Sequence, residues 1–386
     1  MAGQFQFDPI RLPPAAESLR EEVRDFLAKE IEIGTFTPYP TAQGGEFDRE
    51  FSRRVGERGW IGMTWPKKYG GHERSYLERY VVTEEFRAAN APTRAHFTAD
   101  RQSGPIVLKY ATEEIKMDIL PRITRGECTF CIGMSEPDSG SDLFAASTKA
   151  TKADGGWHIN GRKVWTSNAH QADYMIGLFR TSASTKENRR HGLTQFLVDM
   201  KTPGISTRPI LHPTGHHDFN EVVFDDAFMP DDHVFGEVDM AWKQATSELA
   251  FERSGPERFL ETIYVLFELA RVLGEKPDLR SAEGLGRLVA QLHTLRRMSI
   301  SVNGMLEAGK EPVLESSVVK DLGTNWEQAL PARARELAAF VEEETGNRAR
   351  FDEILDFATQ IAPKLTIQGG TREILRGIIA RGLGLR

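Results

Sequence analysis

Three segments combine hydroxyl, aromatic and glycine residues in patterns that suit the binding of a flat, polar ligand. Met134–Asp142 places serines around a proline-led turn, whose backbone N–H groups suit carbonyl or phosphate oxygens. Gly161–Asn168 places a tryptophan before two hydroxyl residues, so that an indole can cover a ring while hydroxyls bond its polar edge. Ile367–Arg376 places a Gly-Gly-Thr turn before a helix, whose first N–H groups can meet an anion. Taken singly, each pattern also fits a solvated loop, a core tryptophan or a capped helix.

Helices are expected on both sides of these segments. Apolar residues recur at helical spacing in Ala16–Glu30, and Glu114–Leu120 is a short helical pattern that Pro121 should stop. After Gly236 the helical pattern returns, with Pro331 expected to open a helix over 332–343. Lys276–Gly284 is the best candidate for an internal loop.

The middle of the chain, from about residue 127 to 237, is expected to form short strands. Two extended runs flank Asn160-Gly161, which predicts a hairpin turn at this pair. Further apolar runs at 174–179, 194–198 and 221–224 indicate a compact β barrel or sandwich. The predicted fold is therefore α+β and mainly α, with domains at 1–126, 127–237 and 238–386.

Composition excludes several classes of protein. The 386 residues carry a formal net charge of −7, which gives no general basic footprint for nucleic acid. No run of 18 apolar residues suggests a membrane span, and the first residues do not resemble a secretory signal. We therefore expect a cytoplasmic protein without nucleic-acid or membrane partners.

Two patterns suggest redox or metal chemistry and are interpreted otherwise. Cys128 and Cys131 have no second cysteine pair, and in a strand residues three apart point to opposite faces, so we expect two small buried side chains. His216-His217-Asp218 has no third ligand at a usual spacing, so no metal is expected.

In order and spacing, the three segments together resemble the acyl-CoA dehydrogenase family. The family's Thr/Ser-Glu-Pro-x-x-Gly-Ser-Asp turn is similar to Ser135–Asp142, and its Asn-Gly-x-Lys-x-Trp-x-Thr/Ser motif to Asn160–Ser167. Its terminal Gly-Thr-x-x-Ile-x-Arg is similar to Gly370–Arg376. The resemblance covers nearly the whole chain. It implies an N-terminal helical domain, a central β barrel and a C-terminal helical bundle.

The resemblance implies FAD as cofactor and dehydrogenation of an acyl-CoA thioester, with electrons passing to an electron-transfer flavoprotein. Its implied cofactor contacts are Ile132, Met134, Ser135, Ser141, Trp165, Thr166, Ser167 and Thr371. Its implied substrate contacts are Ser141, Arg253 and Gly370. The general base should be a carboxylate whose pKa rises when substrate excludes water.

The expected position of that base departs from much of the family. Many members carry a glutamate immediately before the terminal Gly-Thr, where this chain has Gly369. A second group carries it in a Glu-Arg pair on the first helix after the barrel, and Glu252-Arg253 matches that pair. Glu252 is therefore the candidate base, with Glu248 and Glu257 as the nearby alternatives.

Two further departures concern partner chains. The family's Arg-x-x-Phe-Gly segment, which reaches a neighbouring subunit's flavin, has no convincing match after Arg271. The Gly-Gly-x-Gly loop expected near Phe340–Asn347 is also absent. The resemblance implies a homo- or hetero-tetramer, and a non-identical partner chain is one way to complete the adenylate side.

Two alternative functions remain open at this point. A flavin oxidase or monooxygenase of the same fold would let oxygen reoxidise the flavin. A non-catalytic subunit would only complete another chain's FAD site. The sequence does not reveal the length, branching or ring system of the acyl group.

Overall fold

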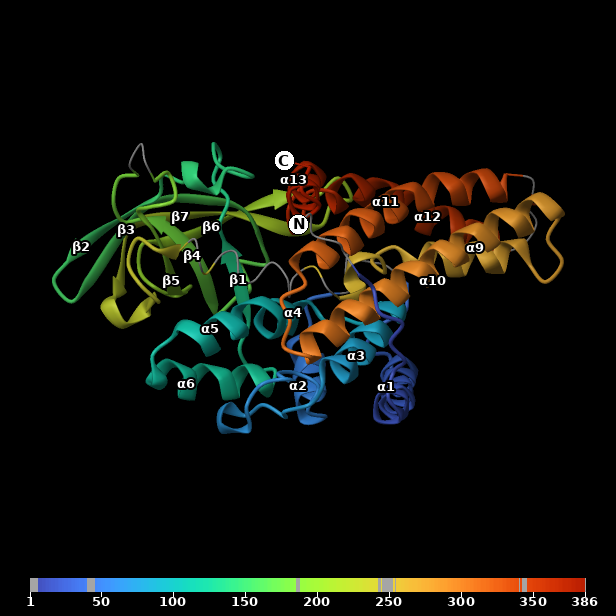
Figure 1. The fold of residues 1–386 in the computed structure, drawn as a ribbon, viewed down its shortest axis with the longest axis horizontal. Coiled ribbons are helices and arrows are strands. Elements are labelled where there is room, and N and C mark those ends of the chain that lie inside the picture. The colour runs from blue at the N-terminus through green and yellow to red at the C-terminus, as the bar shows by residue number, and fades with distance from the viewer. Residues whose placement is uncertain are drawn as a thin grey trace. The chain divides into compact units, whose positions relative to one another are not determined.

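The computed structural model describes residues 6–39, 46–184, 188–241, 244, 253, 255–339, 341 and 346–385. It forms two compact units, each described here by itself (Figure 1). The first comprises Met1–Glu46, Arg74–Pro92 and Ala250–Arg386, and the second Phe47–Glu73 and Thr93–Leu249. The predicted order of helices, β region and helices is confirmed. The predicted domain boundaries remain a prediction.

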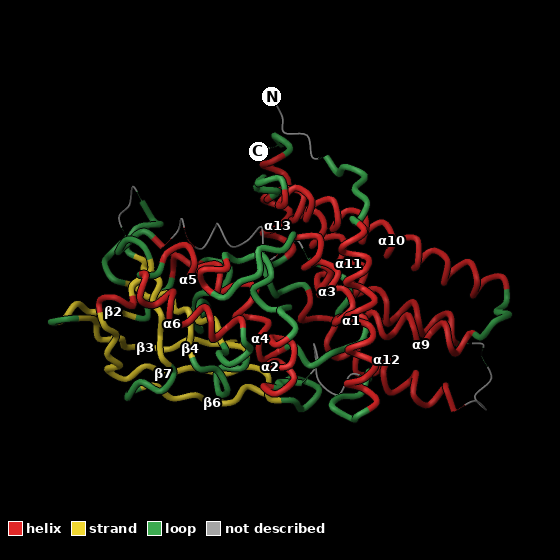
Figure 2. The backbone as a smooth tube through the Cα atoms, turned by 90° about the horizontal axis from the view of Figure 1, so that it is seen from below, coloured by secondary structure: helices red, strands yellow, loops and turns green. Residues whose placement is uncertain are grey.

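The described residues of the first unit are mainly helical. The helices are α1 (Pro14–Glu32), α3 (Tyr76–Ala88), α9 (Ile263–Leu273), α10 (Leu279–Glu307), α11 (Val313–Ala338), α12 (Gly346–Leu365) and α13 (Arg372–Gly382), with a 3-10 turn at Pro256–Arg258. Helices α9 to α12 lie beside one another in two perpendicular views (Figures 1 and 2). Their shared core includes Phe259, Leu269, Leu330 and Phe351, none of which is exposed.

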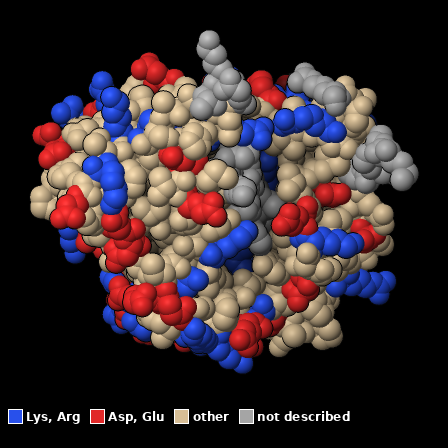
Figure 3. Space-filling view, turned by 60° about the vertical axis from the view of Figure 1, so that its left-hand side comes forward, with Lys and Arg blue, Asp and Glu red and all other residues tan. Residues whose placement is uncertain are grey.

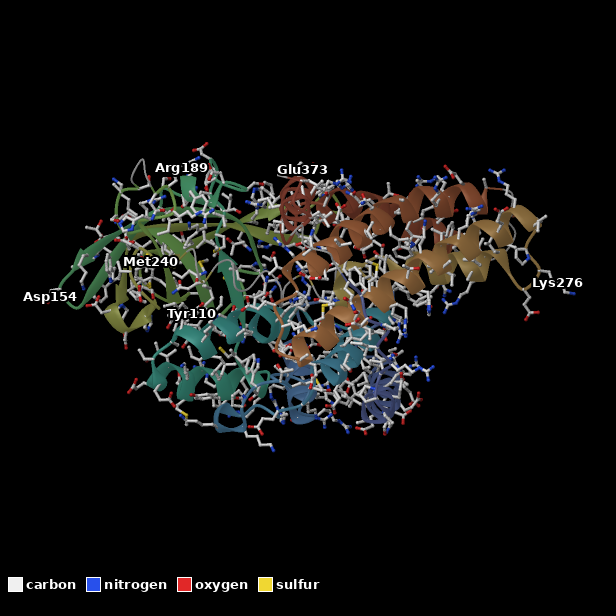
Figure 4. All side chains as sticks on the ribbon, viewed as in Figure 1. Tyr110, Asp154, Arg189, Met240, Lys276 and Glu373 are labelled. Atoms are coloured by element: carbon white, nitrogen blue, oxygen red, sulfur yellow. The ribbon has the colours of Figure 1, made fainter. Side chains whose placement is uncertain are left out.

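Local capping explains several helix starts in this unit. Ser75 and Glu78 form a reciprocal capping box at the start of α3. The Asp278 carboxylate accepts from the first amides of α10, and the Thr371 hydroxyl accepts from Ile374 in α13. The loop expected at Lys276–Gly284 is therefore wrong beyond Asp278, because this cap starts α10 at Leu279. Lys276 lies at the short turn between α9 and α10 (Figure 4).

Two prolines lie inside helices rather than at their ends, so both predictions based on them are wrong. Pro121 lies within α6 (Glu113–Thr124) of the second unit, and Pro331 lies within α11. A proline inside a helix costs about 3 kcal/mol. At Pro331 the burial of Leu330 and Ala334, both unexposed in the core, offsets that cost. Pro121 lies in the last turn of α6, so the helix continues for only three residues beyond it.

The second unit joins short helices to a single sheet. Its helices include α2 (Arg49–Glu57), α4 (Arg94–Thr98), α5 (Gly104–Tyr110) and α6. Its strands are β1 (Phe130–Gly133), β2 (Lys149–Ala153), β3 (Gly156–Ser167), β4 (Tyr174–Arg180), β5 (Leu193–Asp199), β6 (Ile205–Leu211), β7 (His217–Pro230) and β8 (Val234–Phe235). The sheet order is β6-β7-β3-β2-β4-β5-β8, and β1 pairs with β4 in parallel.

This sheet curls around its own core. Trp157 of β3 meets Phe196 of β5 with ring centroids 5.8 Å apart, although these strands are not neighbours. Phe179 of β4 meets Phe224 of β7 at 5.2 Å in the same way. Because alternate residues of a strand share a face, the inward aromatic side chains fill the space between opposed strands. The predicted strands at 174–179, 194–198 and 221–224 are all confirmed.

The hairpin expected at Asn160-Gly161 is wrong. β3 runs without a turn through this pair, and the reversal lies at Ala153–Gly156, where Asp154 marks its tip (Figure 4). Asn160 pairs with Lys149 of β2, and a register shift against β7 falls between Ile159 and Gly161. The φ of +139° at Gly161 shows why glycine is needed there: it accommodates a β-bulge. The Asn-Gly pair therefore reflects a bulge rather than a turn.

The face drawn in Figure 3 gives no sign of one dominant charge. Lysine and arginine side chains are interspersed with aspartate and glutamate over the face drawn in Figure 3. Among the described residues, none of the helices has both the length and the apolar run needed to cross a bilayer.

Candidate functional site

Two of the three chemical segments meet in the second unit. The Val164 amide of β3 donates to the Ser135 carbonyl at 2.9 Å, which joins the segment after β1 to the middle of β3. Met134 and Ser135 are half-buried, as is Ile132 within β1. Sequence-distant residues predicted to contact the cofactor thus come together. The loop residue Ser141 is exposed, between Ser139, whose hydroxyl donates to the Asp142 carbonyl, and the Asp142–Arg189 ion pair.

Trp165 has an unusual backbone and an exposed side chain. Its φ is +58°, a left-handed conformation that costs a non-glycine residue about 1–2 kcal/mol. The register of β3 against β7 shifts between Lys163 and Thr166, which turns the indole outward. Trp165 is 61% exposed, and the Phe219 ring lies edge-on to its indole with centroids 5.9 Å apart. An exposed indole held in a strained backbone is a feature that a ring-shaped ligand explains.

The two hydroxyl residues after Trp165 point in different directions. Ser167 is exposed, like Trp165, whereas Thr166 is completely buried. The buried Thr166 hydroxyl oxygen has no hydrogen-bond partner among the described residues. Ser167 therefore has the more accessible hydroxyl, and any contact from Thr166 would need access to that buried oxygen.

A network of polar side chains bonds to the residues that directly follow Trp165. Arg94 of α4 pairs with Asp218 at 2.6 Å and donates to the Asn168 side-chain oxygen at 3.0 Å. The Asn168 amide donates to the Asp218 carbonyl, and the Asn220 side chain donates to the Thr166 carbonyl at 3.0 Å. These bonds offset the strain at Trp165 and at Asn168, whose φ is +57°. Arg94 was missed by sequence reasoning, because its partners lie far along the chain.

The same network accounts for the histidine run that suggested a metal. Asp218 is paired with Arg94, and the His217 Nε2 lies 2.8 Å from the Asn220 side-chain oxygen. The His217 ring also stacks on His170, with centroids 3.9 Å apart. Burial and the neighbouring His217 lower the pKa of His170, which favours a neutral ring.

Cys128 and Cys131 are free and buried, as the sequence predicted. Burial raises both thiol pKa values, that of Cys128 to about 12. Since the thiolate is the reactive form, neither cysteine is suited to redox chemistry at neutral pH.

The third chemical segment lies in the first unit, where two buried cations hold a glycine turn. The Arg253 Nε donates to the Gly369 carbonyl at 3.1 Å, and the Lys320 Nζ donates to the Gly370 carbonyl at 3.1 Å. Both side chains are about 1% exposed. Gly369 and Gly370 have φ values of +67° and +96°, and a Cβ on Gly370 would lie 2.9 Å from the Arg253 Nη2. The turn therefore requires glycine, and Thr371 follows it as the cap of α13.

The candidate base Glu252 and its alternative Glu248 lie outside the described residues, as do Phe340 and 342–345 near the expected adenylate loop. The alternative Glu257 is 2% exposed. Its carboxylate folds over Gly255, where a Cβ would lie 2.1 Å from Oε2. Lys320 was missed by sequence reasoning, because its partner Gly370 lies 50 positions along the chain.

One prediction follows from the contacts of Arg253. Arg253→Lys keeps the charge but cannot reproduce the planar donor fork that reaches both Gly369 and the Ser317 hydroxyl. We expect kcat/KM to fall about 10²-fold, because a displacement of about 1 Å in a group that positions a substrate can cost that much. Steady-state kinetics measures the effect. Arg287→Lys on α10, whose side chain is 76% exposed, is the matched control and should be unchanged.

Comparison with known proteins identifies the relatives of this chain. Residues 13–127 match the family model for the N-terminal domain of acyl-CoA dehydrogenases, and residues 131–227 match that for the middle domain. Acyl-CoA dehydrogenase IpdE1 of Mycobacterium tuberculosis is 34% identical over 96% of this chain and 97% of its own. Acyl-CoA dehydrogenase FadE34 of the same organism is 36% identical over 86% of this chain but only 45% of its own length. The solved ChsE4–ChsE5 complex from Mycobacterium tuberculosis has a TM-score of 0.82 and 27% identity, covering 98% of this chain and 99% of that one.

Proposed function

Because this chain belongs to the acyl-CoA dehydrogenase family, we propose that it removes hydrogens from Cα and Cβ of an acyl-CoA thioester to give the 2-enoyl-CoA. The chain is an FAD-dependent oxidoreductase, as the members of this family are. Electron-transfer flavoprotein is the proposed acceptor. A bacterial relative solved as a two-protein complex supports a further proposal, that a related partner chain completes a tetramer.

The described residues fit the flavin on two counts. Trp165 presents an exposed indole in a strained backbone, and Ser167 presents an exposed hydroxyl two positions later. Met134 and Ser135 lie beside this strand through the Ser135–Val164 hydrogen bond. We assign Ile132, Ser141, Thr166 and Thr371 as further contacts on the family motifs. Bound FAD supplies the hydride acceptor for the β-hydrogen.

The residues of this chain have three tasks in the reaction. A carboxylate must take the α-proton, hydrogen-bond donors must stabilise the charge that develops on the thioester carbonyl, and the site must exclude water. Glu252 is the proposed base. A carboxylate in this role accepts a proton more readily when exclusion of water raises its pKa.

The Arg253–Gly369 hydrogen bond is the observation that carries the assignment of the base. Gly369 occupies the position where many family members carry their glutamate. The residue directly after Glu252 is bound to the carbonyl of that glycine at 3.1 Å. Arg253 is therefore anchored beside the position that the tail glutamate would otherwise occupy. Arg253 and Gly370 are the proposed substrate-side residues of this turn.

An anaerobic bleaching screen tests the proposed reaction. The purified yellow protein is mixed with straight, branched, aromatic and steroid-derived CoA esters, and flavin absorbance is followed. We expect at least one ester to bleach the flavin and to yield its 2-enoyl product. A yellow protein that none of these classes bleaches would contradict the proposed dehydrogenation.

The choice of acceptor separates the proposal from an oxidase. With a bleaching ester in hand, product formation is compared under electron-transfer flavoprotein and under air, with peroxide measured in both. Turnover that needs the flavoprotein and releases little peroxide is expected. Stoichiometric peroxide in air would instead favour the oxidase alternative. A colourless chain that becomes yellow only with a co-expressed partner would favour the non-catalytic subunit.

A further inference from the structure

A buried ion pair lies beneath the two proposed flavin-binding segments of the second unit. The Lys163 Nζ lies 2.7 Å from a Glu136 carboxylate oxygen, and the two side chains are 0% and 4% exposed. Glu136 directly follows Ser135, and Lys163 precedes Trp165 by two residues. Both partners fall within the motifs discussed above, yet neither is among the proposed cofactor contacts.

The pair binds three segments of the unit together. The Glu136 carboxylate accepts from the Ser147 amide at 2.7 Å, the Ser147 hydroxyl at 2.9 Å and the Thr148 amide at 3.1 Å, just before β2. The Lys163 Nζ also donates to the Met134 carbonyl at 3.3 Å. The segment after β1, the start of β2 and the middle of β3 therefore share one charged centre.

Burial opposes the charged form of both members of the pair. Burial alone would raise the pKa of Glu136, but the Lys163 charge and the hydrogen bonds from Lys163, Ser147 and Thr148 lower it to about 2. Burial lowers the pKa of Lys163 to about 8, although Glu136 opposes the shift. Replacing a buried ion pair with apolar groups is often neutral or stabilising. Stability alone therefore does not explain why both charges are here.

We propose that Glu136 and Lys163 are a positioning pair, which sets the placement of Met134–Ser135 against Trp165–Ser167 and thereby the affinity for FAD. The inference rests on the proposed flavin contacts of those residues. The Lys163–Met134 and Glu136–Ser147 hydrogen bonds hold the segment after β1. The chain itself connects Lys163 through Val164 to Trp165 on β3. Neither member of the pair needs to touch the flavin.

The double variant Glu136→Gln/Lys163→Met tests the role. It removes both charges together, and the single glutamine oxygen can still accept from Ser147, although its amide nitrogen cannot accept from Thr148. We expect the apo form to melt nearer the wild type than Lys163→Met does, since no unpaired buried charge remains. The FAD dissociation constant should nevertheless rise at least tenfold, and the absorption spectrum of the bound flavin should shift. The single variant Lys163→Met, which leaves a buried carboxylate unpaired, should instead melt at a clearly lower temperature.

Two controls make the outcomes distinguishable. Lys152→Met/Asp231→Asn removes an exposed ion pair of 2.6 Å from the same sheet and should change neither melting nor FAD affinity. Trp165→Ala should weaken FAD binding if the proposed contacts hold. A double variant with normal FAD affinity and spectrum, beside a weakened Trp165→Ala, would overturn the positioning role alone. Normal affinity in both would overturn the flavin contacts and the inference with them.

A pH titration of FAD binding gives a second readout. The charged groups that act on Lys163 are Glu136 and Arg180 of β4, whose charge further lowers its pKa. Above pH 8 the folded protein should lose the Lys163 proton, and FAD should dissociate more readily from the wild type. The double variant should lack this step. The same step in the double variant would assign the titration to another group and contradict the pair's role.

Discussion

Glu252→Gln should retain FAD and bind acyl-CoA but lose flavin bleaching by about 10³- to 10⁴-fold, near the upper range for removal of a general base. Glutamine keeps the shape and a hydrogen-bonding oxygen but cannot accept the α-proton. The measurement is the anaerobic rate of bleaching at saturating thioester, with FAD content determined from absorbance. Because substrate binding is saturated, the loss reports the chemical step.

The nearby carboxylate Glu257 is the matched control for this experiment. Its buried side chain packs over Gly255, so Glu257→Gln should mainly lower the melting temperature. Near-normal bleaching by Glu252→Gln would move the base elsewhere. If Glu257→Gln alone abolished bleaching with FAD retained, Glu257 would be the base. Gly369→Glu is not a suitable variant for restoring activity to Glu252→Gln, because the φ of +67° at Gly369 favours glycine.

Glu84→Ala should destabilise the first unit by about 3 kcal/mol, because it leaves the buried Arg20 and the half-buried Arg296 without a main partner. Glu84 of α3 pairs with Arg20 of α1 at 2.8 Å and with Arg296 of α10 at 2.6 Å. The Tyr80 hydroxyl donates to the same carboxylate at 3.1 Å. Arg20 keeps its contact with Glu85, which limits the loss. Denaturant unfolding at pH 7 measures the change.

The ionisation of Glu84 makes the free energy of unfolding depend on pH. Burial would raise the pKa of Glu84, but the hydrogen bond and charge of Arg296, with those of Arg20, outweigh burial and lower it below 4.5. Its stabilisation is therefore full above pH 4.5 and is lost as pH falls through the lower, folded pKa. Glu84→Gln should flatten this part of the stability profile. An unchanged profile would contradict the assignment.

An exposed ion pair is the control for Glu84. Glu283 of α10 pairs with Arg287 at 2.7 Å, but the side chains are 61% and 76% exposed. Such pairs contribute about 0.3–0.5 kcal/mol, so Glu283→Ala should change unfolding little. A loss as large as that of Glu84→Ala would show that burial does not distinguish the two sites.

Most of the fold was predictable because its signals are local. The helical spacing in Ala16–Glu30 led to α1, and short apolar runs led to β4, β5 and β7. Motif order also predicted the family, since the three segments carry side chains whose spacing is specific for it. Within the site, these motifs named Trp165, Ser167 and Arg253 before any coordinates.

What the sequence determined by itself was therefore the order of elements, the family and the identity of the chemical segments, because each is written in neighbouring residues. Tertiary structure alone decided that Asn160-Gly161 is a bulge and that Pro331 lies inside a helix, since a partner strand and a packed core outweigh local turn and breaker preferences. It also decided that Lys163 pairs with Glu136 and that Arg253 reaches Gly369. Those contacts join residues 27 and 116 positions apart, and only burial makes their pairing necessary.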